Sequence, residues 1–212
     1  MKWWLAVMVA LALQQSRPST VQVIFETELG RFTVEVDAAH APITAANFLK
    51  YVDDGFYDGG RFHRAVRPDT ELRTDFPIQV IQAGIRGARR DAPTIPLERT
   101  NTTGLKHVDG AISMARNGPD TATSEFFICI GAQPELDFGG RRNADGQGFG
   151  AFGRVVAGMD VVRKIQAAPV KDKTETLTPP IGIVKASRVR TRTQGALVDG
   201  ISPRDERVEL AR

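Results

Sequence analysis

Three segments of this chain each carry one side chain suited to noncovalent chemistry. Arg64 ends the motif GRFHR at residues 60–64, and an arginine offers fixed N–H donors on a group that stays charged. Gln82 follows the apolar pair at residues 80–81 with a polar amide. Phe127 is the second of two adjacent phenylalanines, which point to opposite faces of a strand, so one belongs to the core and the other can form the floor of a pocket.

A cationic donor, an amide and an aromatic surface can bind and orient a substrate without covalent chemistry. From the pattern alone two alternatives stay open: Arg64 as a surface salt-bridge residue and Gln82 as an edge residue that caps a turn.

The elements that would position these residues are mostly short strands. Two β-rich runs at residues 21–25 and 32–36 flank Gly30, which can take a positive φ, so a hairpin is predicted. Further strands are expected at residues 61–66, 78–82, 110–115, 125–130, 150–156 and 181–189, the last one after the pair Pro179-Pro180. In the strand at 61–66, alternation would place Phe62 and Arg64 on one face and His63 on the other.

Two helices are expected among these strands. Residues 41–52 contain Pro42, which suits a first helical turn, and carry an apolar stripe at helical spacing. Residues 158–165 form the second, with Asp160 as a capping or first-turn acid. Many short strands and two helices predict a mainly β fold, a closed antiparallel β-barrel whose ends the helices cover.

Composition narrows the possible functions. The chain has 212 residues, of which 42% are hydrophobic and 25% charged, enough for one domain with its own core. Lys and Arg number 28 against 25 Asp and Glu, with no basic run interleaved with aromatics, which argues against a nucleic-acid partner. Three histidines and one cysteine form no metal-ligand cluster, so neither metal nor cofactor is expected. Cys129, in an apolar run, is expected to be a buried hydrophobic residue.

The N-terminus has the pattern of an export signal. Lys2 precedes an eleven-residue apolar run at residues 3–13, and Ala10-Leu11-Ala12 has the small-x-small form of a cleavage site. The run is shorter than the roughly 20 residues a membrane span needs. We therefore expect a signal peptide at residues 1–16, no stable membrane span, and an exported protein that is periplasmic or secreted. The alternatives are an uncleaved amphipathic N-terminus or a buried strand. Residues 17–190 would form the domain, expected to be monomeric, and residues 191–212 a flexible tail.

Three motifs together resemble the cyclophilin family of peptidyl-prolyl cis-trans isomerases. They are GRFHR at residues 60–64, Gln82-x-Gly84, and SMARNGPDTATSEFFICIG at residues 113–131. The resemblance extends over residues 21–189. It implies an eight-stranded barrel with two capping helices, and acceleration of X-Pro isomerisation in unfolded or flexible polypeptides that contain proline.

The resemblance also implies roles for single residues. Arg64 matches the catalytic arginine, and Gln82 matches the glutamine that orients it and touches the substrate carbonyl. Phe127 matches the aromatic floor of the proline pocket. The substrate-binding residues so implied are Phe62, His63, Val80, Ala115, Arg116, Phe127 and Leu136, with Leu136 as a pocket wall, His63 as a rim residue, and Ala115 and Arg116 binding peptide through their backbone.

Some positions depart from the family pattern. Gln79 and Val80 stand where an aromatic and a methionine are usual, so the pocket should be smaller or differently shaped, with Phe76 a candidate replacement for the aromatic. Glu125 stands where many members have glutamine, and Glu135 replaces a common tryptophan.

Two segments, residues 67–75 and 138–147, are insertions relative to compact members of the family. The second displaces a pocket-side histidine, so Phe149 or Gly148 falls in its place.

The altered pocket leaves a second hypothesis open: a cyclophilin-fold binding or chaperone module that holds X-Pro segments with little turnover. Retention of Arg64, Gln82 and Phe127 favours the enzyme. A hydrolase using Ser124 and His63 has no Gly-x-Ser-x-Gly elbow or acid–base pairing to support it.

Cyclosporin should bind this protein poorly. The tryptophan indole that commonly donates a hydrogen bond to it is replaced by Glu135, and an unmatched polar group at a buried contact costs about 1–3 kcal/mol. An inhibition titration checks this, and nanomolar inhibition would contradict it.

Overall fold

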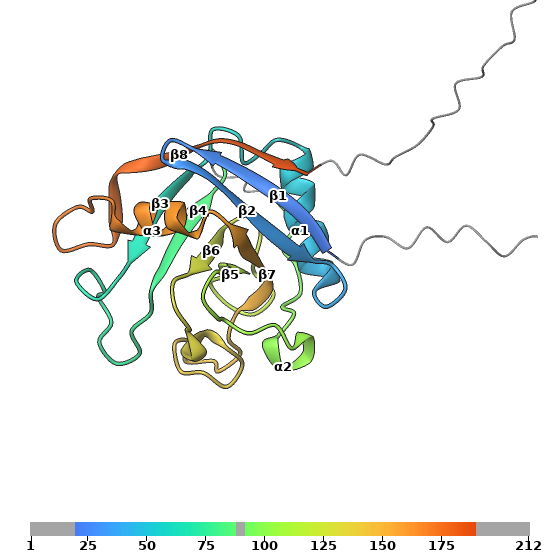
Figure 1. Ribbon diagram of the computed structural model, residues 1–212. Helices are drawn as coiled ribbons and strands as arrows, with labels where there is room; N and C mark the ends of the chain where they lie inside the picture. Colours follow the sequence, from blue (N-terminus) through green and yellow to red (C-terminus); the bar gives the residue numbers. More distant parts are fainter. Residues whose placement is uncertain (1–19, 88–91, 190–212) are drawn as a thin grey trace, which may run out of the picture.

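Figure 1 shows a closed β-barrel in the computed structural model, which describes residues 20–87 and 92–189. Around the ring the strands follow the order β1-β2-β7-β5-β6-β4-β3-β8, and each pair of neighbours is antiparallel. The strands are β1 Thr20–Thr27, β2 Gly30–Asp37, β3 Arg61–Val66, β4 Val80–Gly84, β5 Ala111–Met114, β6 Phe126–Cys129, β7 Gly150–Ala157 and β8 Thr176–Arg188. The expected eight-stranded barrel is confirmed, whereas the predicted leader at 1–16 and tail at 191–212 lie outside the described residues.

Two helices pack against the barrel, as expected. Helix α1, Pro42–Asp53, has its proline in the first turn and contacts β8, β2 and β7. Helix α3, Met159–Ala167, contacts β2, β3 and β4. Two single-turn elements were not predicted: helix α2, Thr100–Thr103, and a 3-10 turn at Pro134–Leu136. The turn brings Leu136 to a buried position beside β6.

Aromatic rings fill the barrel interior. Phe25 is fully buried, lies 5.1 Å from Phe32 in a stacked arrangement, and also meets the rings of Phe48, Tyr57 and Phe126. A second apolar cluster lies on the other face of the same wall of strands. It comprises Val66, Ile78, Val80, Ala111, Phe127, Cys129 and Leu136. Strand β6 and the apolar residues of β4 are therefore buried on both faces of the wall, which explains the apolar runs at residues 80–81 and 126–129.

The predicted limits of two strands need correction. Strand β4 begins at Val80, two residues later than expected, and ends at Gly84. Strand β8 begins at Thr176 and runs through the proline pair that was expected to precede it. In its pairing with β3, Ile181 lies opposite Phe62 and Thr176 opposite Arg64, so residues 177–180 fall in an irregularity of the ladder. Prolines are tolerated there because they have no N–H to donate.

The prediction that Phe62 and Arg64 share a strand face is wrong. Phe62 lies opposite Ala83 and Arg64 opposite Gln82, so His63 is an extra residue in a β-bulge against β4. The pairing with β8 is irregular at the same place. Phe62 is fully buried in the barrel core, together with Ala65. Arg64 therefore faces the outer side of the wall, where the second cluster lies.

Replacing Phe25 by alanine should lower the free energy of unfolding by about 3–5 kcal/mol, because the variant loses a buried ring and leaves a cavity among its neighbours. Urea denaturation measures the change. Leu72→Ala is the control, since that side chain is 64% exposed in a loop and the expected change is within about 0.5 kcal/mol. Equal losses in the two variants would contradict the assignment of Phe25 to the core.

Candidate active site

A pocket of about 510 Å³ lies on the outer face of β4 and β6. Its volume is in the range of small-ligand and peptide side-chain sites. The sequence-predicted residues that line it are Arg64, Gln82, Val80, Ala115, Arg116, Phe127 and Leu136. Residues from five separate segments of the chain thus meet at one place, which the order of the strands around the barrel brings about.

Phe127 lies in the wall of this pocket with its ring packed against two other rings. The ring is 5% exposed and meets Phe149 edge-to-face at 5.3 Å between centroids. The imidazole of His107 is stacked 5.9 Å from it, with 14° between the planes. Its neighbour Phe126 is in the barrel core, so the expected division of the two phenylalanines is confirmed. Phe149 lines the pocket where the sequence left a choice between it and Gly148.

A Ser–His–Asp arrangement lies behind the Phe127 ring. His107 Nδ1 is 2.8 Å from Asp137 Oδ1, and His107 Nε2 is 3.0 Å from Ser113 Oγ. Burial alone would raise the pKa of Asp137, but the hydrogen bonds from His107 outweigh it and hold that pKa below its ordinary value. Ser113 is completely buried, so its hydroxyl cannot reach a substrate. The group supports the pocket floor and is not a hydrolase triad.

Arg64 is held at the pocket by two hydrogen-bonded partners. Its Nη1 donates to Gln82 Oε1 at 3.0 Å, a bond across the β3–β4 pairing in which the two residues lie opposite each other. Its Nε and Nη2 both lie 2.7 Å from Glu175 Oε2. The arginine side chain remains 31% exposed, so the guanidinium is fixed and still accessible from the pocket.

Gln82 connects Arg64 to a second carboxylate. Its Nε2 donates to Glu125 Oε2 at 2.8 Å, while its oxygen accepts from the guanidinium. Glu125 Oε2 is also 3.4 Å from His63 Nε2. The glutamate that replaces the family's usual glutamine therefore fixes the orientation of the Gln82 amide, because a carboxylate can only accept.

Arg116 anchors the pocket wall with a buried side chain, and the part of this residue that stays exposed is its backbone. The guanidinium is 1% exposed, makes a two-pronged ion pair with Asp145, and also donates to the carbonyl of Gly148. Its Cζ lies 5.1 Å from the centre of the Phe149 ring. Bonds from this guanidinium hold the pKa of Asp145 below its ordinary value. Arg116 thus ties the inserted segment 138–147 to the wall.

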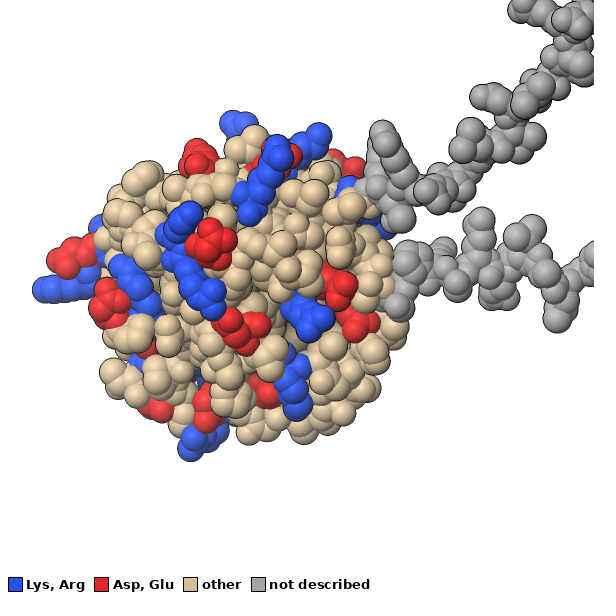
Figure 2. All heavy atoms as spheres, viewed as in Figure 1, with Lys and Arg blue, Asp and Glu red and all other residues tan. Residues whose placement is uncertain are grey.

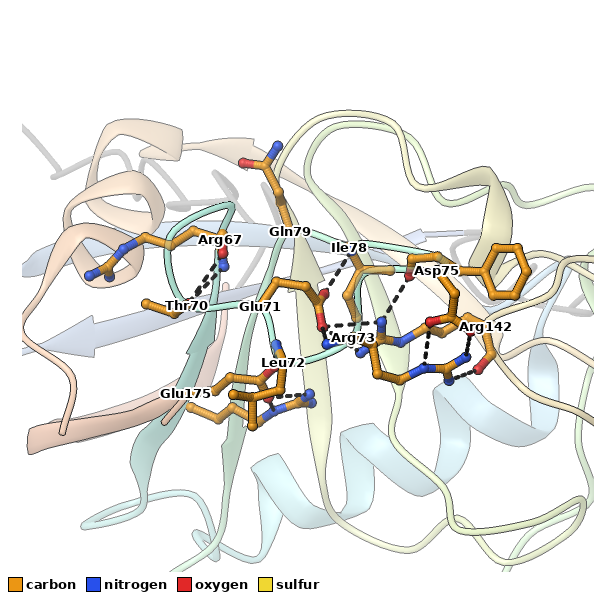
Figure 3. A network of polar contacts seen from close by, with 12 residues as sticks. Arg67, Thr70, Glu71, Leu72, Arg73, Asp75, Ile78, Gln79, Arg142 and Glu175 are labelled. Atoms are coloured by element: carbon orange, nitrogen blue, oxygen red, sulfur yellow. Dashed lines mark hydrogen bonds and ion pairs between the residues drawn. The ribbon is translucent and has the colours of Figure 1, made fainter. Parts of the chain in front are cut away.

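The two inserted segments brace each other beside the pocket (Figure 3). Arg142 pairs with Glu71 at 3.2 Å and donates to the carbonyl of Phe76 at 2.8 Å. Glu71 also accepts from the amides of Arg73 and Ile78 at 2.9 Å each. Burial alone would raise the pKa of Glu71. These hydrogen bonds and the charge of Arg142 outweigh the effect of burial, so the pKa of Glu71 is below its ordinary value. Arg73 and Arg142 line the pocket, so the braced insertions form its side wall.

Two predicted substrate-binding residues lie away from the pocket lining. Phe62 is in the barrel core because of the bulge, which corrects its predicted contact with the pocket. His63 lies beside Glu125 and does not line the cavity, so its place at the rim stays a prediction. Phe76 also stays outside, with Arg141 Cζ 4.4 Å from the centre of its ring. Ile78 supplies the apolar wall in its stead.

Sequence reasoning missed Glu175 altogether. It lies 111 residues from Arg64 in the chain, in a polar stretch that resembles any surface turn. Cys129, in contrast, is buried as predicted, and burial raises the pKa of its thiol far above the ordinary value. A thiol in that state is inert.

Charges of both signs are interspersed over the face of the molecule shown in Figure 2. Among residues 20–87 and 92–189, no group of three or more His, Cys, Asp or Glu side chains is placed to hold a metal ion. Within the same residues no helix has the length and apolar character needed to cross a membrane.

Comparison with known proteins assigns the family. Residues 22–188 match the family described as cyclophilin type peptidyl-prolyl cis-trans isomerase/CLD. A peptidyl-prolyl cis-trans isomerase-like 1 from Neurospora crassa is 37% identical over 79% of this chain and 94% of its own length. Peptidyl-prolyl cis-trans isomerase A from Dickeya dadantii is 32% identical over 82% of this chain and 86% of its own.

A solved structure agrees with the fold. A cyclophilin type peptidyl-prolyl cis-trans isomerase from Cryptosporidium parvum superposes with a TM-score of 0.65 at 22% identity, over 81% of this chain and 99% of its own. The family match covers nearly all of the described barrel, and the relatives are similar along almost their whole lengths. The chain belongs to the cyclophilin-type peptidyl-prolyl cis-trans isomerase family.

Proposed function

We propose that this pocket holds the ring of a proline in a flexible polypeptide and that Arg64 donates a hydrogen bond to the prolyl nitrogen as the X-Pro bond rotates. The observation that carries the proposal is the accessible guanidinium of Arg64, fixed by Gln82 and beside a pocket lined by Phe127. It agrees with the family's reaction. A second Cryptosporidium parvum structure of this fold, at 22% identity, was solved in the presence of the dipeptide Ala-Pro.

The proposed mechanism is noncovalent. In the planar amide the nitrogen lone pair is delocalised and accepts hydrogen bonds poorly, whereas in the twisted amide it is localised. A donor aimed at that nitrogen is therefore bound more strongly in the transition state than in the ground state, which is the requirement for catalysis. Phe127, Leu136 and Val80 supply apolar contacts for the ring. Gln82 and the Ala115–Arg116 backbone hold the flanking peptide.

Arg64→Ala should lower the catalysed rate by one to three orders of magnitude, equivalent to roughly 1.4–4 kcal/mol, because the donor is lost. The measurement is the cis-to-trans rate of an Ala-Pro-Phe peptide. Arg163→Ala is the matched control, since it removes the same charge from an exposed ion pair with Asp109. An unchanged rate in folded Arg64→Ala would remove the mechanism. If the native protein binds X-Pro peptides without accelerating them, it is instead a binding module.

We further propose that the protein is exported. The support is the sequence pattern of Lys2, the apolar run at residues 3–13 and Ala10-Leu11-Ala12. Expressed at full length in a bacterium with two membranes, the protein should appear in the periplasm, with its N-terminus near the Ala10-Leu11-Ala12 segment removed. N-terminal sequencing of the fractionated protein checks this. A Val7→Arg variant, with its apolar run broken, should stay uncleaved in the cytoplasm. Uncleaved native protein in the cytoplasm would contradict export.

A further inference from the structure

Glu175 lies in the turn that leads into β8 and is anchored directly beside Arg64. Its carbonyl accepts from the amide of Ala65 at 2.9 Å, and the next residue, Thr176, lies opposite Arg64 in the β3–β8 pairing. The turn itself is closed by Thr174, whose hydroxyl donates to the carbonyl of Lys171 at 2.7 Å and accepts from the amide of Thr176 at 3.1 Å. The backbone therefore fixes where the Glu175 side chain starts.

The Glu175 carboxylate uses both oxygens on separate partners. Oε2 lies 2.7 Å from both Nε and Nη2 of Arg64, and Oε1 accepts from the amide of Leu72 at 3.2 Å. The glutamate side chain is 10% exposed, so this charge-assisted contact is largely shielded from water. Figure 3 shows Glu175 beside Leu72 of the inserted segment 67–75.

We propose that Glu175 is a positioning residue for catalysis: it holds the Arg64 guanidinium in the orientation that serves the prolyl nitrogen. This inference rests on the proposed function of Arg64. An arginine side chain is long and has many rotamers, and a displacement of a catalytic group by about 1 Å can cost 10²-fold in rate. Gln82 contacts only one terminal nitrogen. Glu175 engages the Nε edge, and the two partners together fix the plane of the guanidinium.

The arrangement leaves donors for a substrate. A guanidinium has five N–H groups. Glu175 takes the one on Nε and one on Nη2, and Gln82 takes one on Nη1. Each terminal nitrogen therefore keeps one further N–H. Because Arg64 lines the pocket, these are the donors available to a bound proline segment.

Among the arginines that line the pocket, Arg64 is the one that forms its ion pair with Glu175. Arg116 pairs with Asp145, Arg142 with Glu71, and Arg73 with Asp75. Removing the Glu175 carboxylate should therefore free the Arg64 guanidinium and the Leu72 amide, and leave the ion pairs of the other three arginines intact.

The test compares kcat and KM of the full chain with those of Glu175→Ala and Glu175→Gln. Glu175→Ala should lower kcat about tenfold or more with KM changed less than about threefold, because the apolar pocket is unaltered. Glu175→Gln should recover part of the loss, since its amide oxygen can still accept from Nε. In ¹⁵N NMR spectra the Arg64 Nε–H signal should be slow to exchange with water in the native protein and fast in Glu175→Ala.

Two further variants separate positioning from a general structural effect. Glu28→Ala is the matched control, because the Glu28 carboxylate, like that of Glu175, accepts from a backbone amide, here that of Gly182 in β8, but does not touch Arg64. It should leave kcat unchanged. In the background of Arg64→Ala, adding Glu175→Ala should cause no further loss. Thermal unfolding confirms that each variant is folded.

The outcomes distinguish the two proposals. If Arg64→Ala has no effect, the proposed mechanism fails. If Arg64→Ala slows the reaction but folded Glu175→Ala does not, the positioning role of Glu175 is wrong. A loss that persists undiminished in the Arg64→Ala background would also overturn it, because Glu175 would then act independently of the arginine.

Discussion

The extra residue in β3 is the constraint on which the site depends. In a regular strand, residues two apart share a face, which would turn both Phe62 and Arg64 toward the barrel interior. The bulge at His63 shifts the register against β4, so that Phe62 packs with the core rings and Arg64 reaches the outer wall. A charged group at an inward position would have to be desolvated without a partner, which is prohibitively costly. One short strand can thus serve core and pocket together.

The barrel, both covering helices and seven of the residues that line the pocket could be predicted from the sequence, because apolar alternation and the motifs around Arg64, Gln82 and Phe127 are local features. The bulge could not be predicted, because the alternation of residue types along the strand gives no indication of an extra residue at His63. Neither could Glu175, because its bond to the arginine depends on how β8 pairs with β3. What the sequence lacks in both cases is the register between strands that are distant in the chain.

Paired charges give the pocket much of its shape. The ion pair of Glu71 and Arg142 has side chains only 4% and 9% exposed, and the side chain of Arg116 is 1% exposed, although its partner Asp145 is 32% exposed. Buried pairs are costly to desolvate, and they persist when further hydrogen bonds satisfy the remaining donors and acceptors. Here the carbonyls of Phe76 and Gly148 accept those bonds. The two insertions are therefore rigid walls whose arginines present little unbalanced charge to a peptide.

The described chain begins and ends on neighbouring strands. The amide of Val189 donates to the carbonyl of Gln22 at 2.8 Å, so both ends leave the barrel from the β1–β8 side, as Figure 1 also shows. In the ring of strands, β6 with Phe127 lies diametrically across from β1. A tether, fusion partner or surface attachment joined at either end would leave the pocket facing outward. Joining residues 20 and 189 by a short linker would likewise make this barrel a suitable host for circular permutation.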